Sequence, residues 1–234
     1  MTEKIFCPAS LAVAAALQPA WCAPPLATDD ASTLPPGACQ FEIEQRQFHS
    51  RVERDMVPVC NVWFDMEIGI GHQRVAPTAA PRADSIVFQF KKVLVPADVS
   101  GWSFGLAAAT IRATGGESGT RQHYLNALAT RQFENTAMHL NLGVVADKEA
   151  DAGTRKHRLS WGIAVEQDTS DRWTLVGEVF GQLGLPETIQ LGLRWWAVPK
   201  LMQFTTSLGA QRGAGRDGRW VSFGVRFETG GSIF

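Results

Sequence analysis

The chain carries five histidines that could act as general bases, namely His49, His72, His123, His139 and His157. A hydrolase embedded in strands needs a serine and a histidine on one face, which an even spacing provides because side chains alternate between faces. His49 and Ser50 are adjacent, and His157 stands three positions before Ser160, so both pairs point to opposite faces. The sequence therefore predicts no catalytic residues. A hydrolase whose pair is assembled across strands is the less favoured alternative.

Neither a cofactor nor a metal ion is expected. The histidines are dispersed along the chain, and the cysteines lack the close pairs that hold a structural metal. Gly115-Gly116 and the pair Gly213 and Gly215 lack the strand and helix context of a phosphate-binding loop. The formal net charge of −1 argues against a nucleic-acid partner.

The amino-terminal residues resemble an export signal. Lys4 precedes an apolar stretch centred on residues 11–17, and the small residues Ala20 and Ala23 follow. We therefore expect a cleaved signal peptide at residues 1–23 and a proline-rich periplasmic linker at residues 24–38. No other run approaches the 18 or so apolar residues of a membrane-spanning helix.

The elements that must position any functional residue are strands. In residues 220–228, Val221, Phe223, Val225 and Phe227 alternate with polar or small residues, which gives one apolar face and one polar face. This pattern recurs about every 15 to 20 residues, in segments of about ten residues, the length of tilted strand that crosses a bilayer. The sequence thus predicts an all-β transmembrane protein, an antiparallel up-and-down β-barrel.

Ten of the expected strands occupy the ranges 63–73, 84–95, 101–113, 121–133, 136–147, 156–167, 171–182, 187–198, 200–212 and 217–229. A hairpin at 39–47 and 51–60 raises the number to twelve and places both ends of the barrel chain in the periplasm. Ten strands, with residues 39–60 as a periplasmic appendage, is the competing arrangement. The barrel is expected over residues 39–229, followed by a C-terminal tail at residues 230–234.

Two cysteines remain after signal cleavage, Cys39 and Cys60. An even number of cysteines in an oxidising compartment indicates a disulfide. In the twelve-strand arrangement they begin and end one hairpin, where paired strands bring opposed residues close enough to bond. The sequence predicts a Cys39–Cys60 bridge at the periplasmic edge.

The alternation of side chains along the strands also assigns the remaining candidate residues to the membrane interface or to the lumen. An aromatic girdle is expected at one membrane interface, from the tryptophans near the periplasmic ends of the strands: Trp63, Trp102, Trp173 and Trp195. The charged residues expected to face the lumen are Glu42, Glu44, Asp65, Glu67, Lys91, Glu166, Glu178, Arg194 and Arg226. Because the last strand must pair with the first, Arg226 is expected near Glu42 or Glu44.

With these segments the chain resembles the Gram-negative outer-membrane β-barrel proteins over nearly all of its mature length. Its last strand resembles their C-terminal assembly signal, with Phe227 as the closing aromatic residue, although residues 228–233 precede a terminal Phe234. Residues 175–180 and 190–196 resemble hairpins of poorly characterised transporter-like small barrels, without pointing to a specific member. The resemblance implies the cell outer membrane as location, and outer-membrane lipid and the barrel-assembly machinery as partners.

The lumen suggests a function. A charge in a narrow lumen is costly unless it is paired, so one interpretation is a network of ion pairs in a closed structural barrel. The other is a narrow porin-like channel or facilitator with a mixed-charge lumen, and the many small inward residues favour it. We therefore expect transport of a small solute, whose identity the sequence does not give.

Overall fold

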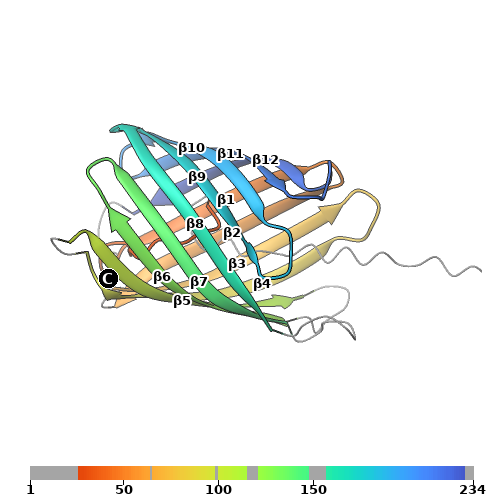
Figure 1. Ribbon diagram of the computed structural model, residues 1–234, viewed down its shortest axis with the longest axis horizontal. Helices are drawn as coiled ribbons and strands as arrows, with labels where there is room; N and C mark the ends of the chain where they lie inside the picture. Colours follow the sequence, from red (N-terminus) through yellow and green to blue (C-terminus); the bar gives the residue numbers. More distant parts are fainter. Residues whose placement is uncertain (1–25, 64, 98–99, 115–120, 148–156, 230–234) are drawn as a thin grey trace, which may run out of the picture.

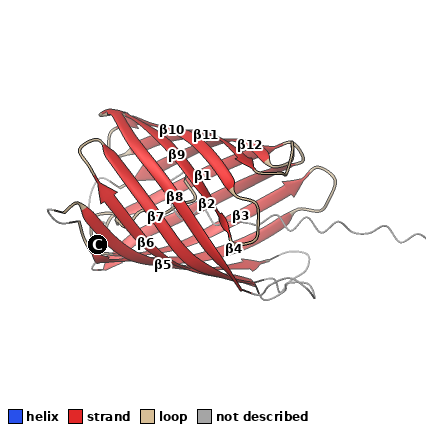
Figure 2. Ribbon diagram, in the orientation of Figure 1, coloured by secondary structure: helices blue, strands red, loops and turns tan. Residues whose placement is uncertain are grey.

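Twelve antiparallel strands form one closed barrel in the computed structural model, which describes residues 26–63, 65–97, 100–114, 121–147 and 157–229 (Figures 1 and 2). Their bounds are β1 Cys39–Phe48, β2 Arg51–Trp63, β3 Met66–Pro77, β4 Ala83–Val95, β5 Trp102–Ala113, β6 Arg121–Gln132, β7 Thr136–Asp147, β8 His157–Ser170, β9 Trp173–Gln182, β10 Thr188–Val198, β11 Met202–Gln211 and β12 Arg219–Glu228. No helix within these ranges is long and apolar enough to cross a membrane.

Each strand pairs with its neighbours in the chain, and β1 pairs with β12 to close the sheet. The twelve-strand prediction is confirmed. We call the end where β1 begins and β12 ends the base, and the opposite end the upper end; the base lies at the left of Figure 1. At the base, Thr229 N–H donates to Cys39 C=O, and Cys39 N–H donates to Thr229 Oγ1, so the two terminal strands are joined at their ends.

The strand boundaries follow the predicted ones closely, with one correction between β2 and β3. β2 continues through Trp63, and β3 starts only at Met66, whereas the sequence suggested a strand starting at residue 63. Asp65 lies in the intervening turn with φ 54°, exposed to solvent. Its expected place on the lumen face was therefore wrong, because the hairpin turns at this position instead of continuing as strand.

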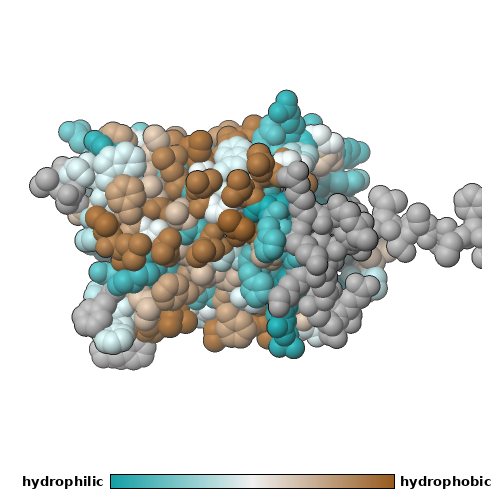
Figure 3. Space-filling model, turned by 60° about the horizontal axis from the view of Figure 1, so that its bottom comes forward, coloured by the Kyte–Doolittle hydropathy of each residue, from teal (hydrophilic) through white to brown (hydrophobic). Residues whose placement is uncertain are grey.

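The outward side chains form the apolar belt that a bilayer requires. Leu191 and Leu208 are each 67% exposed and Phe223 is 62% exposed, all on strands whose alternate residues are buried inside. Figure 3 shows the apolar residues gathered in the middle of the barrel surface. In water these exposed side chains would be unfavourable, so their placement fits a lipid environment.

The tryptophans expected in the girdle all lie toward the base. Trp102 and Trp173 begin their strands, Trp195 lies near the end of β10, and Trp63 ends β2 rather than beginning a strand. Trp173 stacks on Trp195, with ring centroids 5.7 Å apart. Indole rings at this level have an apolar body for the acyl chains and an N–H for the polar interface.

Cys39 and Cys60 are opposed in the β1–β2 ladder and joined by a disulfide, with a Cα–Cα distance of 4.0 Å. The predicted bridge is confirmed. It lies at the base, where it ties the first hairpin together beside the closing contact of β1 with β12.

Residues 26–38, the described part of the expected periplasmic linker, do not lie outside the barrel. Residues 26–38 lie inside the barrel and contact the lumen wall; several of them, including Leu26, Thr28 and Asp29, are buried. The expected signal peptide at residues 1–23 and the tail at residues 230–234 fall outside the described residues.

The outward register generates a test. Phe223→Arg should impair folding, because a cationic side chain on the lipid face near the midplane costs about 2 to 4 kcal/mol. Heat-dependent gel mobility of the refolded protein would measure the folded fraction, with Phe223→Leu as the matched apolar control. Equal folding of the arginine and leucine variants would place Phe223 away from lipid.

The disulfide generates a second test. Replacing both Cys39 and Cys60 with alanine should lower the urea concentration at which the folded gel band is lost. The bridge closes a loop with a sequence separation of 21 residues. A bridge over about 20 residues contributes about 3 kcal/mol on the chain-entropy model. A reductant should destabilise the wild type and leave the double variant unchanged; two free thiols in folded wild type would contradict the bridge.

Candidate functional site

The lumen is the candidate functional site, because the barrel gathers its charged residues there. All the charged residues expected on the lumen face, except Asp65, belong to the inward sets of their strands. Glu53 and Asp55 of β2 are also inward and buried, and the prediction missed them. Their alternation with Arg54 and Met56 could have identified them.

The inward charges form ion pairs within one strand and between strands. Arg194 on β10 lies 2.7 Å from Glu166 on β8, and Arg226 on β12 lies 2.7 Å from Glu228 and 3.7 Å from Glu42. The β1–β12 register places Arg226 directly opposite Glu42, one of the two expected partners. A paired charge avoids much of the cost of leaving water, so the pairing is what allows these residues to lie inside.

A separate cluster lies higher on β1 and β2. Arg46 meets the carboxylate of Asp55 at 2.5 Å and those of Glu44 and Glu53 at 3.5 and 3.8 Å. One guanidinium thus serves three carboxylates on two paired strands. This cluster lies above the segment of residues 26–38, and its ion pairs join residues of β1 and β2 to one another.

Residues 26–38, which we call the inner segment, cross the lumen below that cluster. At one wall the Glu178 carboxylate accepts hydrogen bonds from Ala27 N–H and Thr28 N–H, at 2.7 to 3.0 Å. At the opposite wall Glu67 accepts from Leu34 N–H at 2.6 Å. Two glutamates, on β9 and β3, therefore hold the inner segment by accepting hydrogen bonds from its backbone N–H groups. Charge-assisted bonds of this kind are stronger than neutral ones.

Lys91 holds the middle of the inner segment. Its ammonium lies 3.2 Å from Asp29 and from Asp30 and 3.5 Å from Glu67. Burial raises the pKa of the Asp29 carboxyl to about 7, although Lys91 acts in the opposite direction. Burial also acts to raise the pKa of Asp30, but the attraction of Lys91 and His139 dominates and the net shift is downward. Lys91 thus lies at the same distance from both aspartates and ties them to β4.

Further contacts fit the inner segment to the wall. The Asn141 amide, oriented to satisfy its hydrogen bonds, accepts from Asp29 N–H at 2.6 Å and donates to Asp29 C=O at 2.8 Å. Thr28 packs directly over Gly162, where a Cβ would collide with its hydroxyl. Leu26 packs with Ala164 and Val176. The wall is thus shaped for this segment by a glycine, an amide and small apolar residues.

Among the described residues, two cavities of about 50 Å³ or more border the inner segment. The first, of about 140 Å³, lies between the segment and strands β1 to β4 and β12; its lining includes Glu42, Glu67, Lys91 and Arg226. Two oxygens of its lining, Gln40 Oε1 and Gln89 Oε1, are buried without a hydrogen-bond partner among the described residues. Buried polar atoms normally have a partner, so this cavity suits water or a polar solute.

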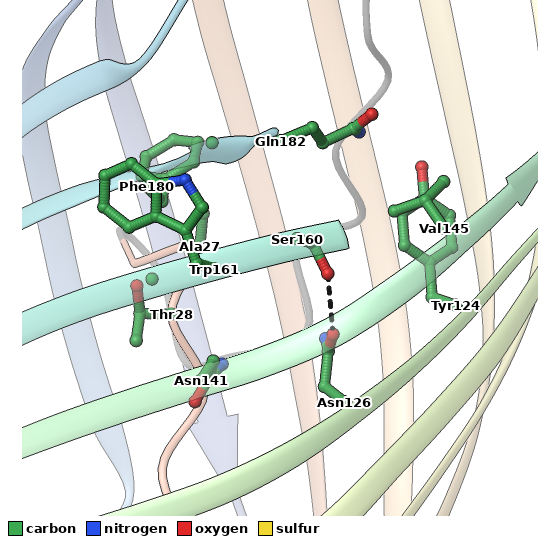
Figure 4. Close-up of a pocket in the computed structure, with 12 residues that line it drawn as sticks. Ala27, Thr28, Tyr124, Asn126, Asn141, Val145, Ser160, Trp161, Phe180 and Gln182 are labelled. Carbon is green, nitrogen blue, oxygen red and sulfur yellow. Dashed lines mark hydrogen bonds between the residues drawn. The ribbon is translucent and has the colours of Figure 1, made fainter. Parts of the chain in front are cut away.

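The second cavity is smaller, about 50 Å³, and lies on the other side of the inner segment (Figure 4). Ala27 and Thr28 border it from the segment, and Tyr124, Asn126 and Ser160 border it from the wall. The Ser160 hydroxyl donates to Asn126 Oδ1 at 3.2 Å. Its lining is uncharged, in contrast with that of the first cavity.

A hydroxyl, an imidazole and a carboxylate do meet across strands. Thr130 Oγ1 lies 2.9 Å from His139 Nδ1, and His139 Nε2 lies 3.5 Å from Glu166. However, Ala31 N–H donates to Thr130 Oγ1 at 2.9 Å, and the hydroxyl is buried beneath the inner segment. A nucleophile must be open to its substrate, so this arrangement serves to hold Ala31. The part of the chain that the structure describes shows no group of three ligands for a metal ion.

The inner segment could not be recognised from its sequence. Its prolines and small polar residues are typical of a linker, and its hydrogen bonds to the wall reach residues between 23 and 151 positions away. Asp29 and Asp30 were the signal available, because adjacent acids beside a lumen containing Lys91 could pair with it.

The anchoring generates a test. Glu178→Gln should loosen the inner segment, because the variant loses the negative charge that strengthens the bonds to Ala27 and Thr28. Ala31→Cys in this background should react with a small thiol reagent several times faster than Ala31→Cys alone. Glu134→Gln, in the exposed connection between β6 and β7, is the matched control. Equal labelling rates in the three proteins would show that Glu178 does not hold the segment.

Comparison with solved structures gives the same fold. The chain is similar to the NanC porin, with a TM-score of 0.62 and 9% identity, over 81% of this chain and 98% of that one. It is also similar to the KdgM porin in complex with disordered oligogalacturonate, with a TM-score of 0.61 and 8% identity over the same shares. Outer membrane phospholipase A from Escherichia coli matches with a TM-score of 0.50 and 11% identity, over 84% of this chain and 97% of that one.

These likenesses show the fold of Gram-negative outer-membrane β-barrels, porins and an enzyme among them, and at such identities they show the fold alone. No curated protein sequence matches the chain. A family model described as "Uncharacterised conserved protein UCP029691" matches residues 10–228. The chain therefore belongs to that family, and its own fold is a closed twelve-stranded barrel.

Proposed function

We propose that this protein is a narrow outer-membrane channel for a small polar solute, whose lumen is restricted by the inner segment. The observation that carries the proposal is the polar cavity of about 140 Å³ beside that segment. A barrel that only needed a stable interior would gain more from apolar packing than from buried ion pairs. Here Glu42, Glu67, Lys91 and Arg226 border open space instead.

The lining suggests the kind of solute. Asp30, Glu42 and Glu67 oppose Lys91 and Arg226 around the cavity. A lining with both signs of charge offers donors and acceptors together, which favours a small polar or zwitterionic solute over a long polyanion. Twelve strands lie between the eight of a filled barrel and the sixteen of a wide pore, which agrees with a narrow passage.

The fold of the NanC and KdgM porins supports a channel as a general type of function. The structure described for KdgM contains oligogalacturonate. The mixed charge of the present lumen gives no reason to transfer an acidic oligosaccharide to this chain.

A closed structural barrel is the second candidate. The inner segment favours it, because Glu178, Glu67, Lys91 and Thr130 hold that segment across the lumen from several strands. The two candidates differ in whether ions pass. A hydrolase is less supported, since the Thr130 hydroxyl is engaged by Ala31.

The test is conductance in planar bilayers. Wild type should give small single-channel currents, and deletion of residues 26–34 should increase them several-fold because that deletion removes most of the inner segment. Arg226→Gln should shift selectivity toward cations because it removes a positive charge from the cavity lining. Glu42→Gln should shift selectivity toward anions because it removes a negative charge.

Arg212→Gln, in the connection between β11 and β12, is the control and should leave both conductance and selectivity unchanged. Folding of each variant is verified by heat-dependent gel mobility. Folded protein that stays silent both as wild type and after the deletion would exclude the channel and leave the closed barrel.

A further inference from the structure

The outer surface of the barrel is electrically uneven. Strand alternation places Arg54, Arg74, Arg112 and Arg121 on the outward faces of β2, β3, β5 and β6, in their upper halves. The described outward positions of β7 to β11 carry no Arg, Lys, Asp or Glu. A general preference for polar interfaces would distribute charges around the barrel, so the concentration on one side needs a specific cause.

The four arginines, which we call the arginine surface, form two directly opposed pairs. Arg54 is the register partner of Arg74, and Arg112 is the register partner of Arg121. Like charges directly opposite each other on one face of a sheet are destabilising. Arg54 also donates to Gln45, which leaves its charge uncompensated.

One acidic residue pairs with part of this positive charge. Asp84 on β4 lies 2.7 Å from Arg74 and 3.2 Å from His72. Among the described residues, no other acid lies on the outward faces of β1 to β6. The arginine surface therefore keeps a net positive charge on an outer wall that faces lipid.

Apolar side chains continue the same surface toward the base. Ile70, Phe88, Leu106 and Leu125 lie outward on β3 to β6 and are exposed. Figure 3, in which the bottom of the Figure 1 view comes forward, shows hydrophilic residues next to the apolar belt. A molecule that covers both parts must have acyl chains and anionic groups at one end.

The leaflet follows from the ends of the barrel. The longer connections, including residues 114–120, 148–156 and 212–218, join strands at the upper end, while the base has turns such as residues 171–172 and 199–201. In outer-membrane barrels the short turns are periplasmic and the long loops external. The arginine surface thus lies at the level of the outer leaflet.

We propose that the arginine surface binds a diphosphorylated glycolipid of the outer leaflet, with its acyl chains on the apolar residues below. Each opposed arginine pair holds one phosphate, because guanidinium groups bind phosphate in a bidentate manner and the anion relieves the repulsion within the pair. The two pairs lie on different hairpins on either side of β4, which fits two separated phosphates better than one. A phospholipid with a single phosphate would engage only one pair.

The test uses the full-length mature protein folded in a neutral detergent and titrated with three lipids. Diphosphorylated lipid A should bind about tenfold more tightly than monophosphorylated lipid A or dioleoylphosphatidylglycerol, because it engages both pairs. The double variant Arg112→Gln, Arg121→Gln should lose this preference. Arg219→Gln is the matched control, since Arg219 is an exposed arginine at the upper end of β12 outside the surface.

Three outcomes would overturn the proposal. These are equal affinity for all three lipids, equal loss of affinity in the double variant and the Arg219 control, and no binding at all. If the double variant fails to fold, Arg112→Lys with Arg121→Lys keeps the charge while removing the planar fork. That variant should still weaken binding of diphosphorylated lipid A several-fold, and an unchanged affinity would also overturn the proposal.

Discussion

The closure of β1 onto β12 is the constraint on which the rest of the structure depends. In a bilayer core, water is not available for unpaired backbone N–H and C=O groups, so a sheet can cross only when it has no free edge. Here nine register pairs, from Gln40 opposite Glu228 to Phe48 opposite Trp220, join the two ends of the chain. Once the sheet is closed, every strand has one face toward lipid and one toward a confined interior, which fixes the role of each alternate residue.

The confined interior explains the polar half of the sequence. Inward charged side chains are buried inside a wall whose outer face contacts lipid. They therefore need partners within the lumen. The wall supplies some of these partners, as in Arg194 with Glu166. The inner segment supplies others, because its peptide N–H groups bind Glu178 and Glu67 and its two aspartates bind Lys91. Wall and segment are thus complementary at Glu178, Glu67 and Lys91.

Most of the barrel could be predicted from the sequence because lipid imposes a period of two along every strand. Phe223 and Val225 lie outward because they alternate with small or polar neighbours, and Cys39 opposes Cys60 because the strand count fixes their level. Asp65 was misplaced because alternation does not reveal where a hairpin turns. The inner segment was missed for a different reason. Its contacts are between backbone groups and distant side chains, such as Leu34 N–H with Glu67, and such contacts leave no periodic trace.

The covalent attachment of the inner segment to β1 has a kinetic and thermodynamic consequence. Ala38 is followed directly by Cys39, so the segment is a tethered ligand that cannot diffuse away from its binding site. A short tether gives an effective concentration on the order of millimolar. Individually modest hydrogen bonds are then sufficient to keep the segment bound most of the time. Any free molecule that occupies the same part of the lumen competes with this local concentration, and therefore succeeds only when it is abundant or binds much more tightly.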